Sequence, residues 1–185
     1  SPVPPYPFTP GYEISGVVRQ LGKGVEETGL IIGDRVVAIC GMGGYSEQII
    51  CPAERCFKLP FGISFDVAAA LPVTYLTAHH MLTYLGNFQQ GDSILVHHAA
   101  GGVGTATAQL AKALGASKVF GTASTNKAEF VKSLGMRFID REAEDFVEVC
   151  KRETDGEGVH HALDPVGGKH MMRSYKALRS GGRLY

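Results

Sequence analysis

Residues 93–114 have the spacing best suited to chemistry, in the run SILVHHAAGGVGTATAQLAKAL. An apolar stretch typical of a buried strand leads into a glycine-rich turn, and a helical pattern with small residues on its inner face follows. Gly101 allows the turn to tighten, Gly102 leaves space for a phosphate beside the backbone, and Gly104 allows the helix to pack closely on the strand. Because the free N–H groups at the start of such a helix attract phosphates, the pattern predicts a dinucleotide-binding corner. The expected contacts are Ala100, Gly101, Gly102, Val103 and Gly104.

The glycine pattern departs from the usual Gly-x-Gly-x-x-Gly at its first position, which is Ala99 here. A glycine cluster alone is equally compatible with a tight structural loop that binds nothing. The strand pattern before it and the helical pattern after it favour nucleotide binding, since a phosphate-binding turn needs both. One of His97 and His98, which directly precede the turn, is expected to line the cofactor cleft.

The choice between NAD and NADP is encoded about 20 residues past the glycines, at the end of the second strand. NAD sites carry Asp or Glu there, but the run after Gly121 is TASTNK, and no carboxylate occurs before Glu129. Ser124 and Lys127 suit a 2′-phosphate, and hydrogen bonds to a charged group contribute about 1.5–3 kcal/mol, which corresponds to about a tenfold or larger preference for NADPH. Alternatively, Ser124 and Asn126 only cap the next helix and Lys127 is a solvated surface residue. From these residues alone, both interpretations stay open.

The histidine and cysteine residues do not form a metal-binding pattern. The three histidine doublets place neighbouring rings on opposite faces of a strand or about 100° apart on a helix, so neither arrangement aims two rings at one ion. The cysteines lack the paired spacing of zinc sites and of disulfide frameworks. We therefore expect no bound metal, and reduced thiols that behave as small core residues. The residues concerned are His79, His80, His97, His98, His160, His161, Cys40, Cys51, Cys56 and Cys150.

The composition is that of a globular protein without charge bias. The chain has 185 residues, of which 44% are hydrophobic, and 18 basic residues balance 18 acidic ones. This balance argues against nucleic-acid or membrane-surface binding, since both need an excess of positive charge. No apolar run approaches the roughly 20 residues that span a bilayer. The reduced thiols indicate a cytoplasmic location.

The chain divides near Leu71 into a β-rich part and a part in which strands and helices alternate. Short strands punctuated by glycine and proline predict a compact barrel-like domain before the division. The alternation after it predicts an α/β domain, with a parallel sheet covered by helices. The expected strands are 13–21, 35–40, 45–51, 56–59, 93–98, 118–123, 137–140 and 159–163, and the expected helices are 103–114, 126–134, 144–153 and 169–178, with linking helices within 65–85. The glycine pair at 181–182 is expected to stop the last helix, with a further strand beginning at Arg183.

A series of short motifs runs in order along nearly the whole chain. They are PGYEISGVV (10–18), GDRV (33–36), GYSE (44–47), Pro60, AAALP (68–72), LTA (76–78), Gly91-Asp92, AAGGVG (99–104) and DPVGG (164–168). This series resembles the zinc-independent quinone oxidoreductases, the zeta-crystallin-like branch of the medium-chain dehydrogenase/reductase superfamily. The resemblance implies a GroES-like catalytic domain over residues 1–71 and a Rossmann NADP-binding domain over residues 72–185. It also implies that both are incomplete, because members of the family have further segments before and after this region.

The resemblance implies further site residues outside the glycine turn. Thr77 corresponds to a threonine beside the nicotinamide, and Arg141 to a position that contacts the adenosine or phosphate part. Asp164 and Gly167 correspond to a turn at the cofactor crevice. The alternatives are a hydroxyl bonded to its own helix for Thr77, a helix cap for Asp164 and simple solvation for Arg141. Tyr12 stands where zinc-dependent relatives have a ligand histidine, which implies a zinc-independent protein.

The activity that the resemblance implies is NADPH-dependent hydride transfer to a quinone or an α,β-unsaturated carbonyl. The chemistry belongs to the cofactor, and catalytic side chains are not assigned, since those facing the nicotinamide come partly from the preceding segment. Enoyl reductases, free-standing or within a polyketide synthase, are the alternative in chemistry, and a nucleotide-binding relative without turnover is the alternative of another class. We expect the full-length protein to be a homodimer that uses a small-molecule electron acceptor. Residues 1–185 alone are expected to be inactive and to self-associate through an exposed sheet edge.

Overall fold

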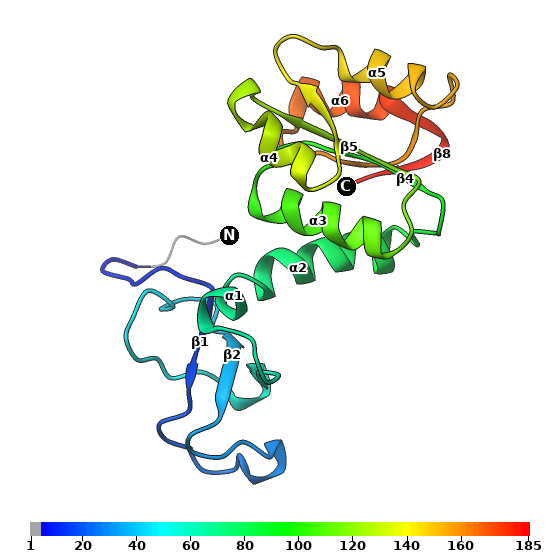
Figure 1. The fold of residues 1–185 in the computed structure, drawn as a ribbon. Coiled ribbons are helices and arrows are strands. Elements are labelled where there is room, and N and C mark those ends of the chain that lie inside the picture. Colours follow the sequence, from blue (N-terminus) through cyan, green and yellow to red (C-terminus); the bar gives the residue numbers. More distant parts are fainter. Residues whose placement is uncertain (1–4) are drawn as a thin grey trace. The chain divides into compact units, whose positions relative to one another are not determined.

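The computed structural model describes residues 5–185, and the chain divides into two compact units between Thr74 and Tyr75 (Figure 1). The division falls inside helix α2 (Pro72–His79). Across the described part of the chain, no helix is both long and apolar enough to span a bilayer.

The first unit is built on a three-stranded antiparallel sheet with the order β1-β2-β3. Its elements are β1 (Glu13–Val17), η1 (Glu26–Thr28), β2 (Arg35–Ile39), η2 (Ala53–Arg55), β3 (Cys56–Lys58) and α1 (Phe65–Ala69). Ser15 lies opposite Val37 in the sheet, and its hydroxyl donates a hydrogen bond of 2.6 Å to the carbonyl of Phe65, which ties α1 to β1. The hydroxyl of Ser64 accepts the N–H of Val67 and so caps α1.

The strand expected over residues 45–51 is absent from this unit, and that prediction was wrong. Gly41 and Gly43 have φ angles of 74° and 89°, in the left-handed region, so the backbone bends where a strand would have to begin. The N–H of Gly43 donates instead to the carbonyl of Thr9, at 2.8 Å. The described residues of this unit form a three-stranded sheet, where the strand spacing had predicted a barrel.

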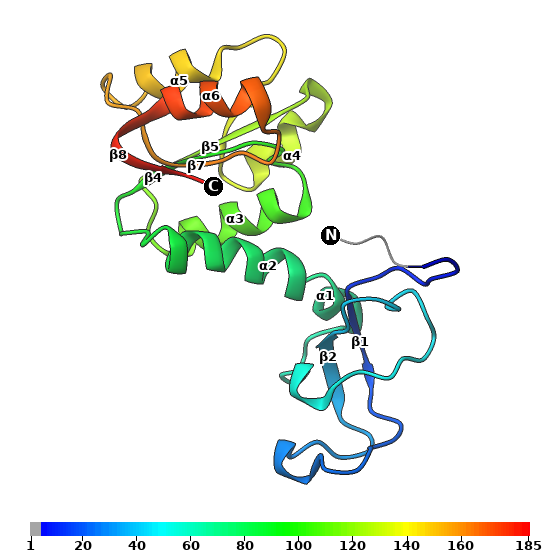
Figure 2. The same ribbon diagram turned by 180° about the vertical axis from the view of Figure 1, so that it is seen from behind.

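The second unit is a five-stranded parallel sheet with the order β6-β5-β4-β7-β8, which confirms the predicted α/β architecture. Helices α3 and α4 lie on one face, and α5 and α6 lie on the other (Figures 1 and 2). Ile94 and Val96 of β4 pack in the core on the α3 side, while Leu95 packs in the core on the α5 side, because successive strand residues face opposite ways. The elements are η3 (His80–Leu85), β4 (Ser93–Val96), α3 (Gly102–Ala113), β5 (Lys118–Ala123), η4 (Thr125–Lys127), α4 (Ala128–Ser133), β6 (Arg137–Asp140), α5 (Phe146–Arg152), β7 (Val159–Leu163), α6 (Gly168–Ala177) and β8 (Leu178–Leu184). The sequence predicted β5, β6 and β7 with these same bounds.

The last strand begins five residues earlier than expected. Helix α6 passes directly into β8 at Leu178, whereas a helix stop at the glycine pair and a strand from Arg183 had been predicted. Val159 lies opposite Leu178 and His161 lies opposite Arg183, so the extra residues of β8 form an irregularity between these two pairs. Gly181, with a φ angle of 76°, supplies the bend inside the strand. The glycine pair therefore marks a bulge rather than a helix end.

Candidate dinucleotide-binding site

The glycine turn connects β4 to α3. It opens at His98, whose φ angle of 52° is unusual for a residue with a side chain. The carbonyl of His98 accepts the N–H of Gly101 at 2.8 Å, and the carbonyl of Gly101 accepts the N–H of Thr105 at 2.8 Å as the first bond of the helix. The N–H groups of the first helical turn therefore have no intrahelical acceptor, which is the arrangement that binds phosphate.

The three glycines of the turn have different surroundings. Gly104 is buried, and a Cβ there would lie 2.6 Å from the carbonyl oxygen of His98 and 2.8 Å from Cα of Ala99. This confirms the close helix–strand contact predicted from the sequence. A Cβ on Gly101 would lie 3.2 Å from the same carbonyl oxygen. Gly102 is exposed at the start of the helix, where a ligand can reach its backbone.

The ends of β5 and β6 bring together the residues expected to discriminate between the cofactors. Ser124 donates to the side-chain oxygen of Asn126 at 2.6 Å, and neither side chain caps the following helix. Lys127 is exposed and forms no ion pair with any described residue. Arg141 follows β6, with its N–H bonded to the carbonyl of Ala123 at 3.1 Å, and its guanidinium lies 3.3 Å from a carboxylate oxygen of Glu142. The capping alternative for Ser124 and Asn126 therefore has no support in the structure.

Asp140 is a carboxylate at this edge that the sequence analysis missed. It accepts a hydrogen bond from the hydroxyl of Thr125, and its second oxygen accepts the N–H groups of Glu142 (2.9 Å) and Ala143 (3.2 Å). The bond from Thr125, with those backbone bonds, holds the pKa of the carboxyl below its ordinary value. The acid was sought only after β5, yet parallel strands end at one edge, so an acid after β6 reaches the same place. Asp140 thus joins the connection after β5 to the connection after β6.

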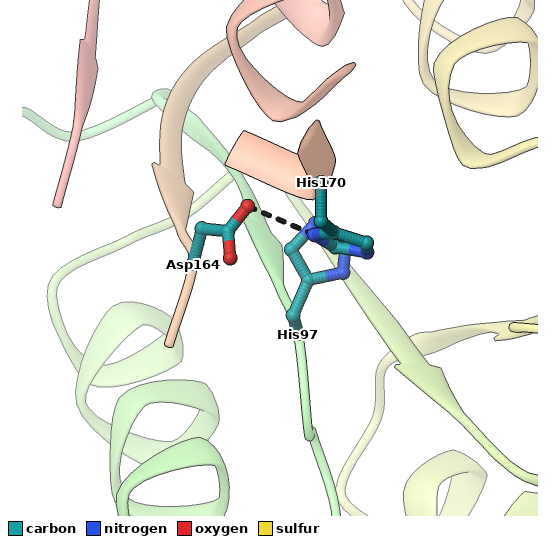
Figure 3. A group of neighbouring side chains, drawn as sticks. All are labelled: His97, Asp164 and His170. Atoms are coloured by element: carbon teal, nitrogen blue, oxygen red, sulfur yellow. Dashed lines mark hydrogen bonds and ion pairs between the residues drawn. The ribbon is translucent and has the colours of Figure 1, made fainter. Parts of the chain in front are cut away.

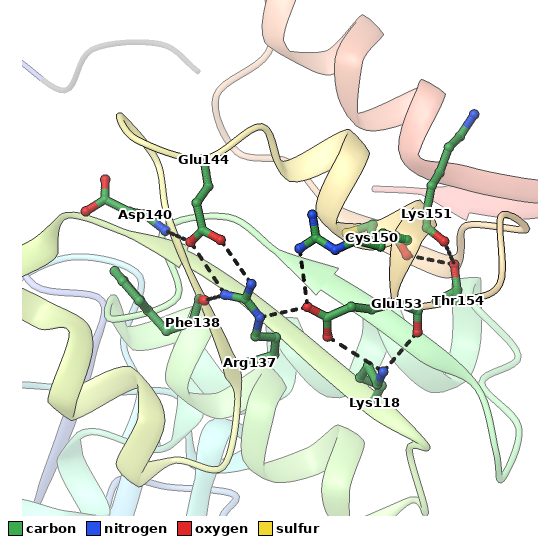
Figure 4. Close-up of polar contacts among 10 residues, drawn as sticks. Lys118, Arg137, Phe138, Asp140, Glu144, Cys150, Lys151, Glu153 and Thr154 are labelled. Carbon is green, nitrogen blue, oxygen red and sulfur yellow. Dashed lines mark hydrogen bonds and ion pairs between the residues drawn. The ribbon is translucent and has the colours of Figure 1, made fainter.

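An ion-pair network fixes the chain just before and after Arg141 (Figure 4). Arg137 lies 3.0 Å from a carboxylate oxygen of Glu144 and 2.9 Å from one of Glu153. The other oxygen of Glu144 accepts the N–H of Asp140 at 3.0 Å. The bond from Arg137 lowers the pKa of Glu144, so this carboxylate stays ionised and keeps both partners at neutral pH.

The carboxylate of Asp164, which directly follows β7, accepts hydrogen bonds from groups of the protein itself. One oxygen accepts the N–H groups of Val166 (2.8 Å) and Gly167 (3.0 Å), and the other accepts the Ser174 hydroxyl (2.5 Å) and Nδ1 of His170 (2.9 Å). Burial opposes ionisation of the side chain, which is 0% exposed, but these hydrogen bonds hold its pKa far below the ordinary value. The structure therefore favours the turn-holding role for this carboxylate over direct contact with a cofactor.

Thr77 lies on α2 and is exposed, and its hydroxyl makes no hydrogen bond to any described residue. The alternative of a hydroxyl bonded to its own helix is thus not observed. Helix α2 lies beside α3, since the hydroxyl of Tyr75 donates to the side-chain oxygen of Gln109 at 2.6 Å. The other expected contacts all lie at the carboxyl ends of β4, β5, β6 and β7, on one edge of the sheet.

His97 is buried away from the expected cleft, whereas His98 is exposed at the turn. The ring of His97 contacts Thr122 and Ser174, and lies 4.3 Å from the ring of His170, centroid to centroid. Figure 3 shows His97 and His170 beside Asp164, and their ligand-type atoms lie within 4.8 Å of one another. Sequence spacing could not reveal this group, because its members come from the turn after β4, from the turn after β7 and from α6.

His160 and His161 contradict the rule used to discount the histidine doublets. The two Nε2 atoms lie 3.5 Å and 2.9 Å from the two carboxylate oxygens of Asp92, so neighbouring rings of one strand do reach one group. Burial lowers the pKa of His161, against the raising effect of the bond to Asp92.

Two family models match the chain on either side of α2. Residues 1–61 match the alcohol dehydrogenase GroES-like domain, and residues 102–185 match the zinc-binding dehydrogenase model. The chain belongs to the medium-chain dehydrogenase/reductase superfamily. The first match covers the unit with the antiparallel sheet, and the second covers the parallel sheet from the glycine turn onward.

Individual members of the superfamily resemble the chain over almost its whole length. The human synaptic vesicle membrane protein VAT-1 homolog is 40% identical over 183 residues, which are 98% of this chain and 46% of that protein. The Escherichia coli quinone oxidoreductase complexed with NADPH superposes with a TM-score of 0.90 at 36% identity, over 99% of this chain and 56% of that chain. The CurK enoyl reductase superposes with a TM-score of 0.88 at 36% identity, over 96% and 53% respectively. The chain thus spans about half the length of these relatives.

The residues around Tyr12 do not fit the zinc ion that the name of one family model implies. Tyr12 is 60% exposed, and a carboxylate oxygen of its neighbour Glu13 accepts the N–H of Val73 at 2.7 Å. The thiol of Cys40 donates to the carbonyl of Gly11, and burial raises its pKa, which opposes the thiolate that zinc needs. No step of the chemistry is therefore assigned to a metal in this unit.

Elemental analysis of the full-length protein, purified without a metal-binding tag, is expected to find no stoichiometric zinc. Treatment with a chelator should leave its turnover unchanged, because no ligand set is available at Tyr12. One zinc ion retained per chain after dialysis against chelator would contradict this expectation.

Proposed function

We propose that the full-length protein is an NADPH-dependent, zinc-independent oxidoreductase that transfers hydride to a quinone or an α,β-unsaturated carbonyl. The observation that carries the proposal is the glycine turn before α3, with unpartnered N–H groups and an exposed Gly102. The relatives support it, since they include a quinone oxidoreductase complexed with NADPH and an enoyl reductase. We propose that residues 1–71 belong to the catalytic domain and residues 72–185 to the nucleotide-binding domain. We also propose a homodimer in the cytoplasm for the full-length protein.

Residues at different places along the sheet edge would contact different parts of the cofactor. The N–H groups of Ala100, Gly102, Val103 and Gly104 would hold the pyrophosphate, while Gly101, whose N–H donates to the carbonyl of His98, would shape the turn around it. Ser124, Lys127 and Arg141, after β5 and β6, would hold the 2′-phosphate. Thr77 and the turn from Asp164 to Gly167 would lie towards the nicotinamide, which supplies the hydride when bound. Acceptor binding and the orientation of the reacting atoms then decide the rate.

Replacing Lys127 by alanine is expected to weaken NADPH binding about tenfold while leaving NADH binding nearly unchanged, because one charged contact to the 2′-phosphate is lost. Isothermal titration of the full-length protein with both cofactors measures this. Lys132→Ala is the matched control, since that lysine is on α4 and already pairs with Glu129 at 2.9 Å. Equal affinities of the unaltered protein for NADPH and NADH would refute the cofactor assignment.

The acceptor is tested by following NADPH oxidation by the full-length protein with a panel of quinones and with an enoyl thioester. Turnover with quinones supports the proposed activity. Turnover with the thioester alone supports the enoyl reductase alternative. NADPH binding without oxidation by either class of acceptor would favour a nucleotide-binding protein without turnover, and would overturn the enzymatic proposal.

A further inference from the structure

A hydrogen-bonded series of polar side chains links the buried His97 in the core of the second unit to the turn after β7. Nδ1 of His97 lies 2.8 Å from the hydroxyl oxygen of Thr122, and Nε2 of His97 lies 3.0 Å from the hydroxyl oxygen of Ser174. That hydroxyl lies 2.5 Å from the Asp164 carboxylate, which also contacts Nδ1 of His170 at 2.9 Å (Figure 3). The five groups come from β5, from α6 and from the residues that directly follow β4 and β7.

The number of protons on these groups fixes which group donates and which accepts in each hydrogen bond of the series. The ionised carboxylate of Asp164 only accepts, so Ser174 donates its single hydroxyl proton there, and His170 donates from Nδ1. The oxygen of Ser174 is then free to accept, and Nε2 of His97 must carry the proton that it receives. Nδ1 of His97 is left as an acceptor for the hydroxyl of Thr122. Every group is satisfied with a neutral His97.

This hydrogen-bonded series ends at the turn after β7, which forms part of the edge of the sheet. The second oxygen of Asp164 holds the N–H groups of Val166 and Gly167. Gly167 is the N-cap residue of α6 and has a φ angle of 75°, so the turn is bent sharply at that residue. Because β7 pairs with β4, this turn lies beside the strand end that carries the glycine turn.

We propose that His97 and Ser174 are positioning residues, which hold the Asp164–Gly167 turn in the shape that receives the nicotinamide half of the dinucleotide. The proposal rests on the function proposed above. The sheet order β6-β5-β4-β7 limits the effect, because the adenosine side lies over β5 and β6, on the other side of β4. Loosening the turn should therefore weaken binding of the whole dinucleotide but not binding of its adenosine half alone.

The test compares Ser174→Ala with the unaltered full-length protein. Alanine is favourable in a helix, and Ser174 is fully buried, so the variant removes one hydroxyl without adding bulk. Losing a bond to a charged acceptor is expected to raise the dissociation constant for NADPH about tenfold or more. The dissociation constant for adenosine 2′,5′-bisphosphate should change less than about twofold, as expected for a group without contact to the turn. Hydrogen exchange in the peptide with Val166 and Gly167 should become faster.

Thr154→Val is the matched control. Its hydroxyl also holds a turn, since it accepts the N–H of Gly158 at 2.8 Å, but it lies before β7, at the opposite edge of the sheet. This variant should change exchange near Gly158 and leave NADPH binding unchanged. If both variants weaken NADPH and the bisphosphate equally, the effect is general destabilisation and the positioning role is wrong.

Two further results separate the proposals. Unchanged exchange and unchanged NADPH affinity in Ser174→Ala would overturn the positioning role while leaving the proposed function intact. An unaltered protein that does not bind NADPH would overturn the proposed function, and with it the nicotinamide role of the turn. Stoichiometric binding of Zn²⁺ that His97→Gln abolishes would also overturn the hydrogen-bonded arrangement, because both ring nitrogens of His97 are used in the bonds to Thr122 and Ser174 and neither is free to ligate a metal.

Discussion

Replacing Gly102 by valine is expected to abolish dinucleotide binding while leaving the fold intact. Gly102 is exposed in the first turn of α3, so a branched side chain there occupies the space of the phosphates rather than the core. Losing two hydrogen bonds to a charged group, at about 1.5–3 kcal/mol each, corresponds to roughly a hundredfold weaker binding or more. The cost to folding should stay within about 1 kcal/mol, since valine is only a moderately poor helix residue. Isothermal titration with NADPH and thermal unfolding followed by circular dichroism measure the two effects separately.

Two further variants serve as controls: Gly104→Ala tests a glycine needed for packing, and Gly22→Val tests a valine at an exposed position outside the turn. A single added carbon at Gly104 would lie 2.6 Å from the carbonyl oxygen of His98, so it must push backbone apart and should cost about 1–3 kcal/mol of stability. Gly22 is exposed with nothing within 4 Å, and its valine variant should bind NADPH normally. Normal NADPH affinity in Gly102→Val would show that the glycine run is only a structural turn.

Local sequence pattern was enough for three strands of the parallel sheet. β5, β6 and β7 pack against helices on both faces, so their apolar runs are bounded sharply by glycine and polar residues. The same method failed at residues 45–51, where Gly41 and Gly43 bend the preceding backbone, and at residues 178–182, where Gly181 bends the strand. Composition reveals such glycines, but their role as a bend, a bulge or a helix end depends on the chain packed beside them.

Contacts between distant segments explain what the sequence could not show of the site. The joining of Thr125 to Asp140, and of His97 to Ser174, follows from the order of the strands and not from spacing along the chain. The glycine spacing and the missing acid after β5 could be predicted from the sequence, because each is a feature of one continuous segment. The hydroxyl, imidazole and carboxylate groups that fix the shape of this edge were not.

Lowering the pH below about 6.5 is expected to destabilise the second unit through His97. Burial is the main cause that lowers its pKa from 6.5 to about 3, and His170, His98 and Arg173 add repulsion that the Asp164 carboxylate only partly offsets. Between these two pKa values, the imidazole of His97 is therefore protonated in the unfolded chain and neutral in the folded protein. The stabilising effect is complete above pH 6.5 and is lost progressively as the pH falls towards 3.

The contribution of His97 is isolated with His97→Gln in the full-length protein. Glutamine keeps a donor for Ser174 and an acceptor for Thr122 but cannot titrate, so the variant should be less stable at pH 7 and lose stability less steeply in acid. One such group accounts for up to about 1.4 kcal/mol of unfolding free energy per pH unit. Urea unfolding at pH 7, 6, 5 and 4 gives both slopes, and His161, whose pKa is also lowered, contributes equally to the two proteins and cancels. Parallel slopes for the two proteins would mean that His97 is already charged in the folded state, which the single direction of its hydrogen bonds does not allow.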